Sequence, residues 1–131
     1  MQKKHFYIDK YRWQVDFFIL DFCNEADKVI FSIGEYNIAQ KIGKKINEFG
    51  INSGLTHSKG RQSIIVVGKS DSAEQFLNTL IHELHHLSVH IAKYYNLDPF
   101  GEETAYIMGD VVSILFDKIK PYICNCCRHD E

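Results

Sequence analysis

The sequence predicts a single α+β domain over residues 1–131, in which a small sheet containing a hairpin packs on two long C-terminal helices. Three features carry this prediction: a helical apolar period over about residues 72–95, a second over about 101–118, and two β-type runs directly before them. The chain has 131 residues, 45% of them hydrophobic and 24% charged, which is typical of one globular domain. We place the core of this domain at about residues 52–120 and a cysteine-rich tail at 121–131.

The first half of the chain predicts a strand, two helices and a hairpin. Residues 11–20 are aromatic and β-branched, as strands are. A short helix follows over about residues 25–33, although residues 28–33 could also form a strand. Helical spacing of apolar residues predicts another helix over 36–49. The hairpin strands are residues 54–57 and 61–68, joined by a turn, Ser58-Lys59-Gly60, that contains a glycine.

The two long helices carry recognisable start and stop signals. Ser70, Asp71 and Ser72 offer N-cap oxygens, and Glu74 and Gln75 follow at the spacing of a capping box. Asn96 and Pro99 end the first long helix after Tyr94 or Tyr95. The second begins at about Gly101 or Glu102, and Pro121 is expected to stop it after Lys118.

The first long helix contains His82-Glu83-Leu84-His85-His86, an H-E-x-x-H pattern. Residues four apart lie on one face of a helix, so the imidazoles of His82 and His86 can converge on one cation. Glu83 projects beside them, where it can act on a water molecule rather than bind the metal. The pattern therefore predicts a zinc site with Glu83 as its general base.

A third ligand is expected from the second long helix. His90 lies about 12 Å along the axis from His82, too far for both to bind one zinc ion, and His85 points about 100° away from His86. Glu102 and Glu103 open the next helix, and we favour Glu102 as the ligand, with Glu103 as the alternative. Acidic residues in a first turn also suit the helix dipole without any metal.

These motifs resemble the gluzincin arrangement of zinc metallopeptidases, in which two histidines on one helix meet a glutamate on the next. The resemblance covers about residues 52–112 and includes His82-Glu83-Leu84-His85-His86 and Glu102-Glu103-Thr104-Ala105-Tyr106. Together with Asn52-x-Gly54-Leu55-Thr56, these segments are also similar to small uncharacterised proteins of gut bacteria and their mobile elements.

The resemblance implies a zincin-like core, a Zn²⁺ cofactor and hydrolysis of a peptide or protein substrate. Glu83 would take a proton from the attacking water and pass it to the leaving amine, and residues 64–67 could pair with an extended substrate if they form an edge strand. Tyr106 stands where gluzincins often have an aspartate that orients the first histidine. Tyr106 and His57 are candidates for supporting roles around the metal, and Tyr94 joins them as a candidate for transition-state stabilisation.

Two other functions stay open on the sequence. One is a zinc-binding regulatory or interaction protein with weak or no turnover, because the orienting aspartate is missing. The other is a metal-dependent hydrolase that acts on a non-peptide amide.

Charge and composition argue against other partners. The net charge of −2 and the scattered lysines exclude a basic nucleic-acid or membrane surface, and no apolar run is long enough to cross a membrane. The N-terminal residues lack the features of a signal peptide, so we expect a cytoplasmic protein. Cys124, Cys126 and Cys127 are read as free thiols in a solvent-facing tail, with a soft-metal site as the alternative.

Overall fold

The computed structural model describes residues 1–33, 40–41, 43–45, 50 and 52–124. Its strands are β1 (Gln2–Ile8), β2 (Trp13–Leu20), β3 (Gly54–Lys59) and β4 (Gln62–Gly68), and its helices are α1 (Ala26–Ile33), α3 (Ala73–Tyr95) and α4 (Glu102–Ile123). Short 3₁₀ turns at Asp9–Tyr11 and Cys23–Glu25 precede β2 and α1. No helix in these ranges has the length and apolar character needed to cross a membrane.

The four strands form one mixed sheet in the order β1-β2-β4-β3. β1 and β2 are antiparallel, β3 and β4 form the antiparallel hairpin, and the central pair β2 and β4 is parallel. The parallel pairing requires a crossover between β2 and the hairpin. This order leaves β3 at one end of the sheet and β1 at the other.

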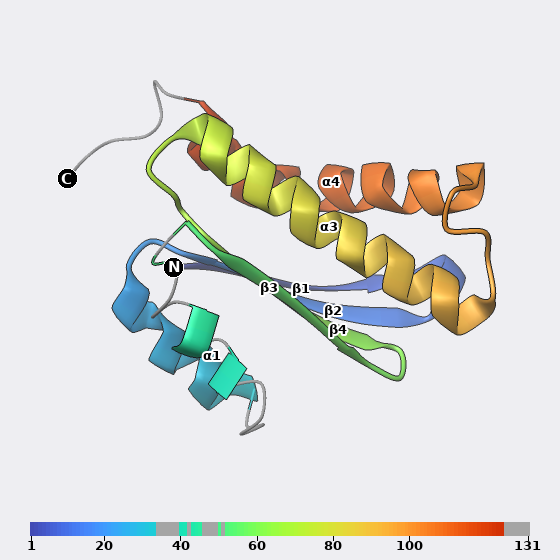
Figure 1. Cartoon of the computed structure of the whole chain (residues 1–131), viewed down its shortest axis with the longest axis horizontal. Helices are drawn as coiled ribbons and strands as arrows, with labels where there is room; N and C mark the ends of the chain where they lie inside the picture. The colour runs from blue at the N-terminus through green and yellow to red at the C-terminus, as the bar shows by residue number, and fades with distance from the viewer. Residues whose placement is uncertain (34–39, 42, 46–49, 51, 125–131) are drawn as a thin grey trace.

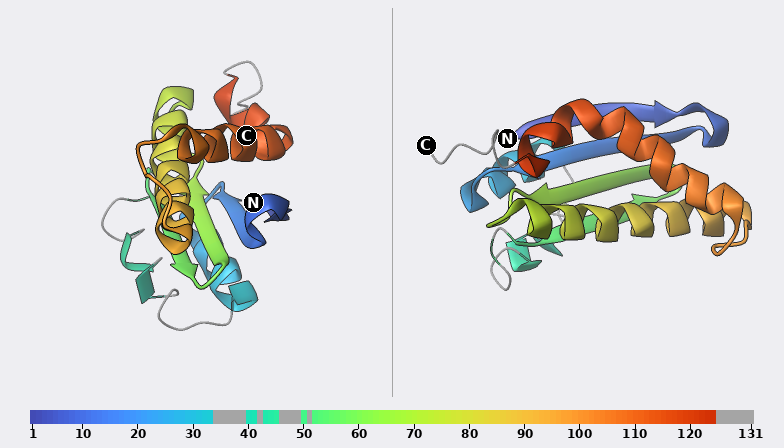
Figure 2. Two further views of the ribbon diagram at one scale, coloured as in Figure 1. Left: turned by 90° about the vertical axis from the view of Figure 1, so that its right-hand side faces the viewer. Right: turned by 90° about the horizontal axis from the view of Figure 1, so that it is seen from above.

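Helices cover both faces of this sheet. α3 and α4 lie on one face, and α1 lies on the opposite face (Figure 1). α3 contacts β3 and β4, whereas α4 contacts α3 and β1. Seen from above, the two long helices therefore lie side by side, α3 over the hairpin and α4 toward β1 (Figure 2). The α+β prediction is confirmed at this level.

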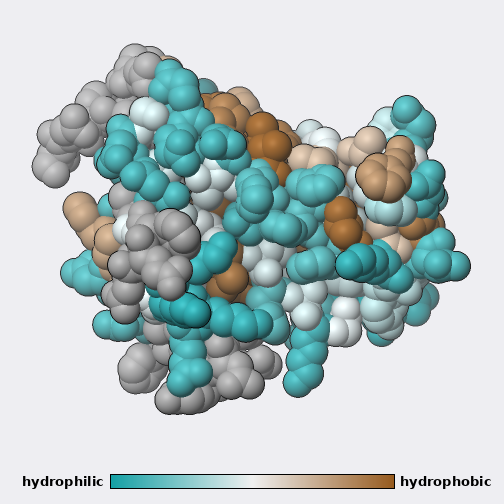
Figure 3. Space-filling model, in the orientation of Figure 1, coloured by the Kyte–Doolittle hydropathy of each residue, from teal (hydrophilic) through white to brown (hydrophobic). Residues whose placement is uncertain are grey.

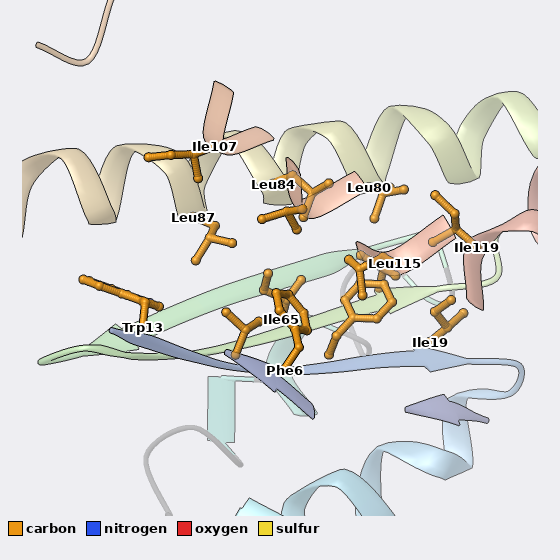
Figure 4. Close-up of a cluster of buried hydrophobic side chains, with 14 of the residues drawn as sticks. Phe6, Trp13, Ile19, Ile65, Leu80, Leu84, Leu87, Ile107, Leu115 and Ile119 are labelled. Carbon is orange, nitrogen blue, oxygen red and sulfur yellow. The ribbon is translucent and has the colours of Figure 1, made fainter. Parts of the chain in front are cut away.

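The main core fills the space between the sheet and the two long helices (Figure 4). Alternate residues of β2 and β4, such as Phe17 and Ile65, point into it and are fully buried. α3 contributes Leu80, Leu84 and Leu87 at the spacing of one helical face. A smaller apolar cluster under α1 uses the other face of the sheet.

α3 begins and ends as predicted. The Ser72 side chain accepts a hydrogen bond from the Gln75 backbone N–H at 3.1 Å and so caps the first turn. Asn96 ends the helix in the left-handed conformation, with φ 57°.

Three local predictions were wrong or incomplete. β1 was missed, because its residues are mostly polar and only Phe6 is buried. The hairpin turn is shorter than expected: β3 extends to Lys59, and Gly60, with φ +61°, and Arg61 complete the turn. Pro121 does not stop α4, because Tyr122 beyond it packs against Phe76 and donates a hydrogen bond to Asp21.

The predicted helix over residues 36–49 lies largely outside the described residues, and so does the tail beyond residue 124. Neither prediction is tested here.

Candidate metal centre

The imidazoles of His82 and His86 converge on the exposed side of α3. Their Nε2 atoms lie 3.1 Å apart and their rings are nearly perpendicular, at 81°. Two nitrogens bound tetrahedrally to one zinc ion, each at about 2.0–2.1 Å, would lie about 3.3 Å apart. The pair therefore fits two ligands of one ion, although the same separation also allows a direct N–H···N hydrogen bond.

Glu83 lies on the side of α3 that faces β3 and is only 3% exposed. The Thr56 hydroxyl, 2.8 Å from Glu83 Oε1 and 3.0 Å from its backbone oxygen, holds the side chain in place. No ion pair to this carboxylate occurs within the described ranges. Burial of a carboxylate without a cation is unfavourable unless hydrogen bonds compensate for the lost water.

Gly54 makes the close approach of Glu83 to β3 possible. A Cβ atom built on Gly54 would lie 2.8 Å from Glu83 Cγ and 3.0 Å from Glu83 Oε2. Any larger residue would displace the carboxylate.

His82 and Glu83 share an open cleft of about 230 Å³ between α3 and the start of β3. Its described lining consists of glycine and polar residues: Lys45, Asn52, Ser53, Gly54, Asn78, Thr79, His82 and Glu83. Lys45 reaches across and donates a hydrogen bond to the Gly54 carbonyl oxygen at 2.9 Å. The face of the molecule around α3 and β3 is largely hydrophilic (Figure 3). The cleft can therefore admit water and polar groups to Glu83.

The structure does not bring the predicted third ligand to this pair. Glu103 accepts a hydrogen bond from the Tyr11 hydroxyl at 2.8 Å and pairs with Lys10 at 3.1 Å, near the start of β2. Glu102 is exposed in the first turn of α4. Among the residues with described positions, no three His, Cys, Asp or Glu side chains are arranged to hold a metal ion.

The layer order explains this separation. Glu83 bonds to β3, so the side of α3 that carries it faces away from α4, which lies toward β1. His86 is three residues from Glu83 and lies on nearly the same side. Glu102 and Glu103 thus begin a helix on the other side of α3.

The remaining candidates are placed away from the pair. Tyr106 is 66% exposed on α4, and Tyr94 packs edge-on against Trp13 at 5.5 Å between ring centroids. His57 alternates with Thr56 along β3 and so lies on the opposite face of the sheet from α3. The predicted edge strand is also corrected: residues 64–67 pair with both β2 and β3, and β3 is the end strand of the described sheet.

Sequence reasoning missed the residues of β3 that support the site. Gly54, Thr56 and Ser58 alternate along the strand, so they share the face toward α3. That alternation was the available signal for Gly54 and Thr56, and Ser58 joins them because β3 extends past residue 57.

No family model matches this sequence, and neither a curated protein nor a solved structure is similar enough to count as a match. What the site does must therefore be inferred from its own residues and geometry.

Proposed function

We propose that the protein is a zinc-dependent hydrolase of peptide bonds with a zincin-like core, in which His82 and His86 bind the metal and Glu83 is the general base. The observation that carries the proposal is that the two Nε2 atoms lie 3.1 Å apart. The next residue after His82, Glu83, is buried and lines the same cleft as His82.

The residues of this chain divide the work as follows. A zinc ion, when bound, polarises a carbonyl group and lowers the pKa of water from 15.7 to about 7. Glu83 Oε1 is held by the Thr56 hydroxyl, which leaves Oε2, on the side of Gly54, to accept the proton of the attacking water. Glu83 then returns this proton to the leaving amine.

β3 supports the proposal by offering a place for an extended peptide. The Gly68 N–H bonds to the Ser53 carbonyl, so residues 53, 55 and 57 direct their backbone groups toward β4. Thr56 and Ser58 accordingly direct theirs away from β4. A substrate strand pairing there would pass beside Glu83.

The decisive experiment is zinc content combined with hydrolysis of a fluorogenic peptide library. The wild type should hold about one zinc ion per chain, and His82→Ala and His86→Ala should lose it. His85→Ala is the matched control, because His85 is an exposed histidine of the same helix that points elsewhere, and it should keep the metal. Glu83→Gln should keep zinc while hydrolysis falls by about 10²–10⁴-fold. A wild type without zinc after zinc-replete purification would refute the proposal.

The third ligand is tested separately. If Glu102 binds the metal, Glu102→Ala should weaken zinc binding while Glu103→Ala should not. Equal zinc affinity in both variants would show that neither residue is a ligand.

A second function is motivated by Tyr106, which stands exposed on α4 in place of an aspartate that would orient His82. In that case the protein binds zinc as a regulatory or interaction protein without turnover. Zinc bound stoichiometrically, with no chelator-sensitive hydrolysis, would favour this function over the enzyme.

A further inference from the structure

A chain of hydrogen bonds runs from the core to the surface of α3 near the histidine pair. Trp13 Nε1 lies 2.8 Å from Ser63 Oγ, Ser63 Oγ lies 2.6 Å from Ser58 Oγ, and Ser58 Oγ lies 2.6 Å from His90 Nδ1. The chain crosses from β2 through β4 and β3 to α3. Trp13 and Ser63 are 1% and 2% exposed, so its inner end is shielded from water.

The chemistry of the inner groups orders the first two hydrogen bonds of this chain. The indole N–H of Trp13 can only donate, so Ser63 Oγ is the acceptor in the first bond. The Ser63 hydroxyl is buried, and Ser58 Oγ is the acceptor that the described residues provide for its hydrogen. Because a buried hydroxyl is rarely left without an acceptor, Ser63 donates to Ser58. We take the hydrogen that remains, that of the Ser58 hydroxyl, as the donor to His90 Nδ1, 2.6 Å away.

A ring nitrogen that accepts a hydrogen bond carries no proton, so the only proton of a neutral His90 is on Nε2. We infer that the Trp13–Ser63–Ser58 chain holds His90 as the Nε2–H tautomer, and that this N–H is a fixed hydrogen-bond donor for a carbonyl oxygen of a peptide lying along β3. The second half of this inference rests on the proposed function.

The surroundings of His90 favour the neutral ring. Burial lowers the pKa of His90, because an imidazolium ion is penalised when it leaves water. The ring therefore remains neutral where an ordinary histidine begins to take up a second proton.

The position of His90 suits contact with substrate rather than with metal. Its ring centroid lies 6.2 Å from that of His86, one turn further along α3, and Ser58 is two residues from Thr56 on the same face of β3. A nitrogen that carries a proton is not a metal ligand, which agrees with the distance along the helix from His82. His90 would instead supply the N–H that neither Tyr106 nor His57 is placed to supply.

The tautomer can be read directly by two-bond ¹⁵N–¹H correlation spectra of the histidine rings, recorded on the protein as purified and after chelation. In the wild type we expect the His90 proton on Nε2 alone. Ser58→Ala and Ser63→Ala should each introduce a population with the proton on Nδ1. Ser88→Ala is the matched control, because its buried hydroxyl donates to the His85 backbone oxygen, outside the chain, and the tautomer should not change. A proton on Nδ1 in the wild type, or no response to either serine variant, would overturn the inference.

The contact with substrate is tested with two variants of His90. His90→Leu removes the donor and should lower kcat/KM by about 10²-fold, mainly through kcat, with zinc content unchanged. His90→Gln places an amide N–H near the position of Nε2 and should recover part of the loss. Equal activity of both variants and the wild type would overturn the substrate contact. A wild type without zinc and hydrolysis would overturn the proposed function and this contact together, while the spectra would still decide the tautomer.

Discussion

Glu83 and Glu103 occupy opposite surroundings although each accepts a hydrogen bond from a hydroxyl 2.8 Å away. Glu83, on α3, receives its bond from Thr56 and is 3% exposed, with no cation paired to it among the described residues. Glu103, on α4, receives its bond from Tyr11, and its side chain is 46% exposed and paired with Lys10. Glu103 has a cation and solvent to stabilise its charge. Glu83 has no paired cation in the described part of the chain and little contact with solvent, so its burial is unfavourable.

This difference in surroundings supports the proposed role of Glu83. A surface carboxylate with a cation and water contributes modestly to stability and can be replaced with little effect. A buried carboxylate with one neutral donor is retained against its desolvation, and it opens on a cleft that also contains His82. Of the two glutamates, Glu83 is therefore the one whose surroundings support the proposed role of general base.

Of the substitutions that test this comparison, Gly54→Ala should change stability the most. The new Cβ would lie 2.8 Å from Glu83 Cγ and 2.9 Å from Thr79 Cγ2, so the buried contact between β3 and α3 must shift. We expect the free energy of unfolding to fall by about 1–3 kcal/mol, measured by chemical denaturation. Gly109→Ala in α4 is the matched control: nothing lies within 4 Å of its Cβ, and helix propensity predicts a gain of about 0.5–1 kcal/mol. If Gly54→Ala were as stable as the wild type, the close packing at Gly54 would not be limiting.

A smaller effect is expected when each glutamate loses its hydroxyl partner. Thr56→Val leaves Glu83 without its donor and should cost about 1 kcal/mol, because water can reach the carboxylate through the cleft. Tyr11→Phe leaves Glu103 with Lys10 and solvent and should cost less than Thr56→Val. Thr56→Ser, which keeps the hydroxyl, should cost less than Thr56→Val. Denaturation midpoints in the reverse order would show that burial does not separate the two glutamates.

Sequence patterns predicted the elements whose determining residues lie close together in the sequence. α3 was predicted within one or two residues at each end, because its apolar period and its caps, Ser72 and Asn96, lie within one stretch of sequence. The convergence of His82 and His86 follows from helical spacing alone. The hairpin was predicted for the same reason, since its two strands are adjacent in sequence.

The parts that were missed depend on packing between distant segments. β1 is a strand because it pairs with β2, not because its own residues are apolar. The side of α3 on which α4 lies is decided by the strand order, so spacing could not show that Glu103 would meet Tyr11 instead of the histidines. The bond from Ser58 to His90 joins residues 32 positions apart.

The smallest expected effect is the pH dependence that Glu103 adds to stability. Hydrogen bonds from Tyr11 and then from Lys10 lower the pKa of Glu103 below its ordinary 4.5. Between the lowered pKa and 4.5 the unfolded chain binds more protons than the folded one, so this contribution is complete above pH 4.5 and is lost as the pH falls through the folded pKa. Denaturation midpoints of the wild type and Tyr11→Phe should therefore differ near neutral pH and approach each other on acidification. Lys4 separately lowers the pKa of Asp117, and the acid destabilisation from that pair should persist in both proteins. A gap between the two proteins that did not narrow at any acid pH would mean that Tyr11 stabilises the fold by packing alone and not through the carboxylate of Glu103.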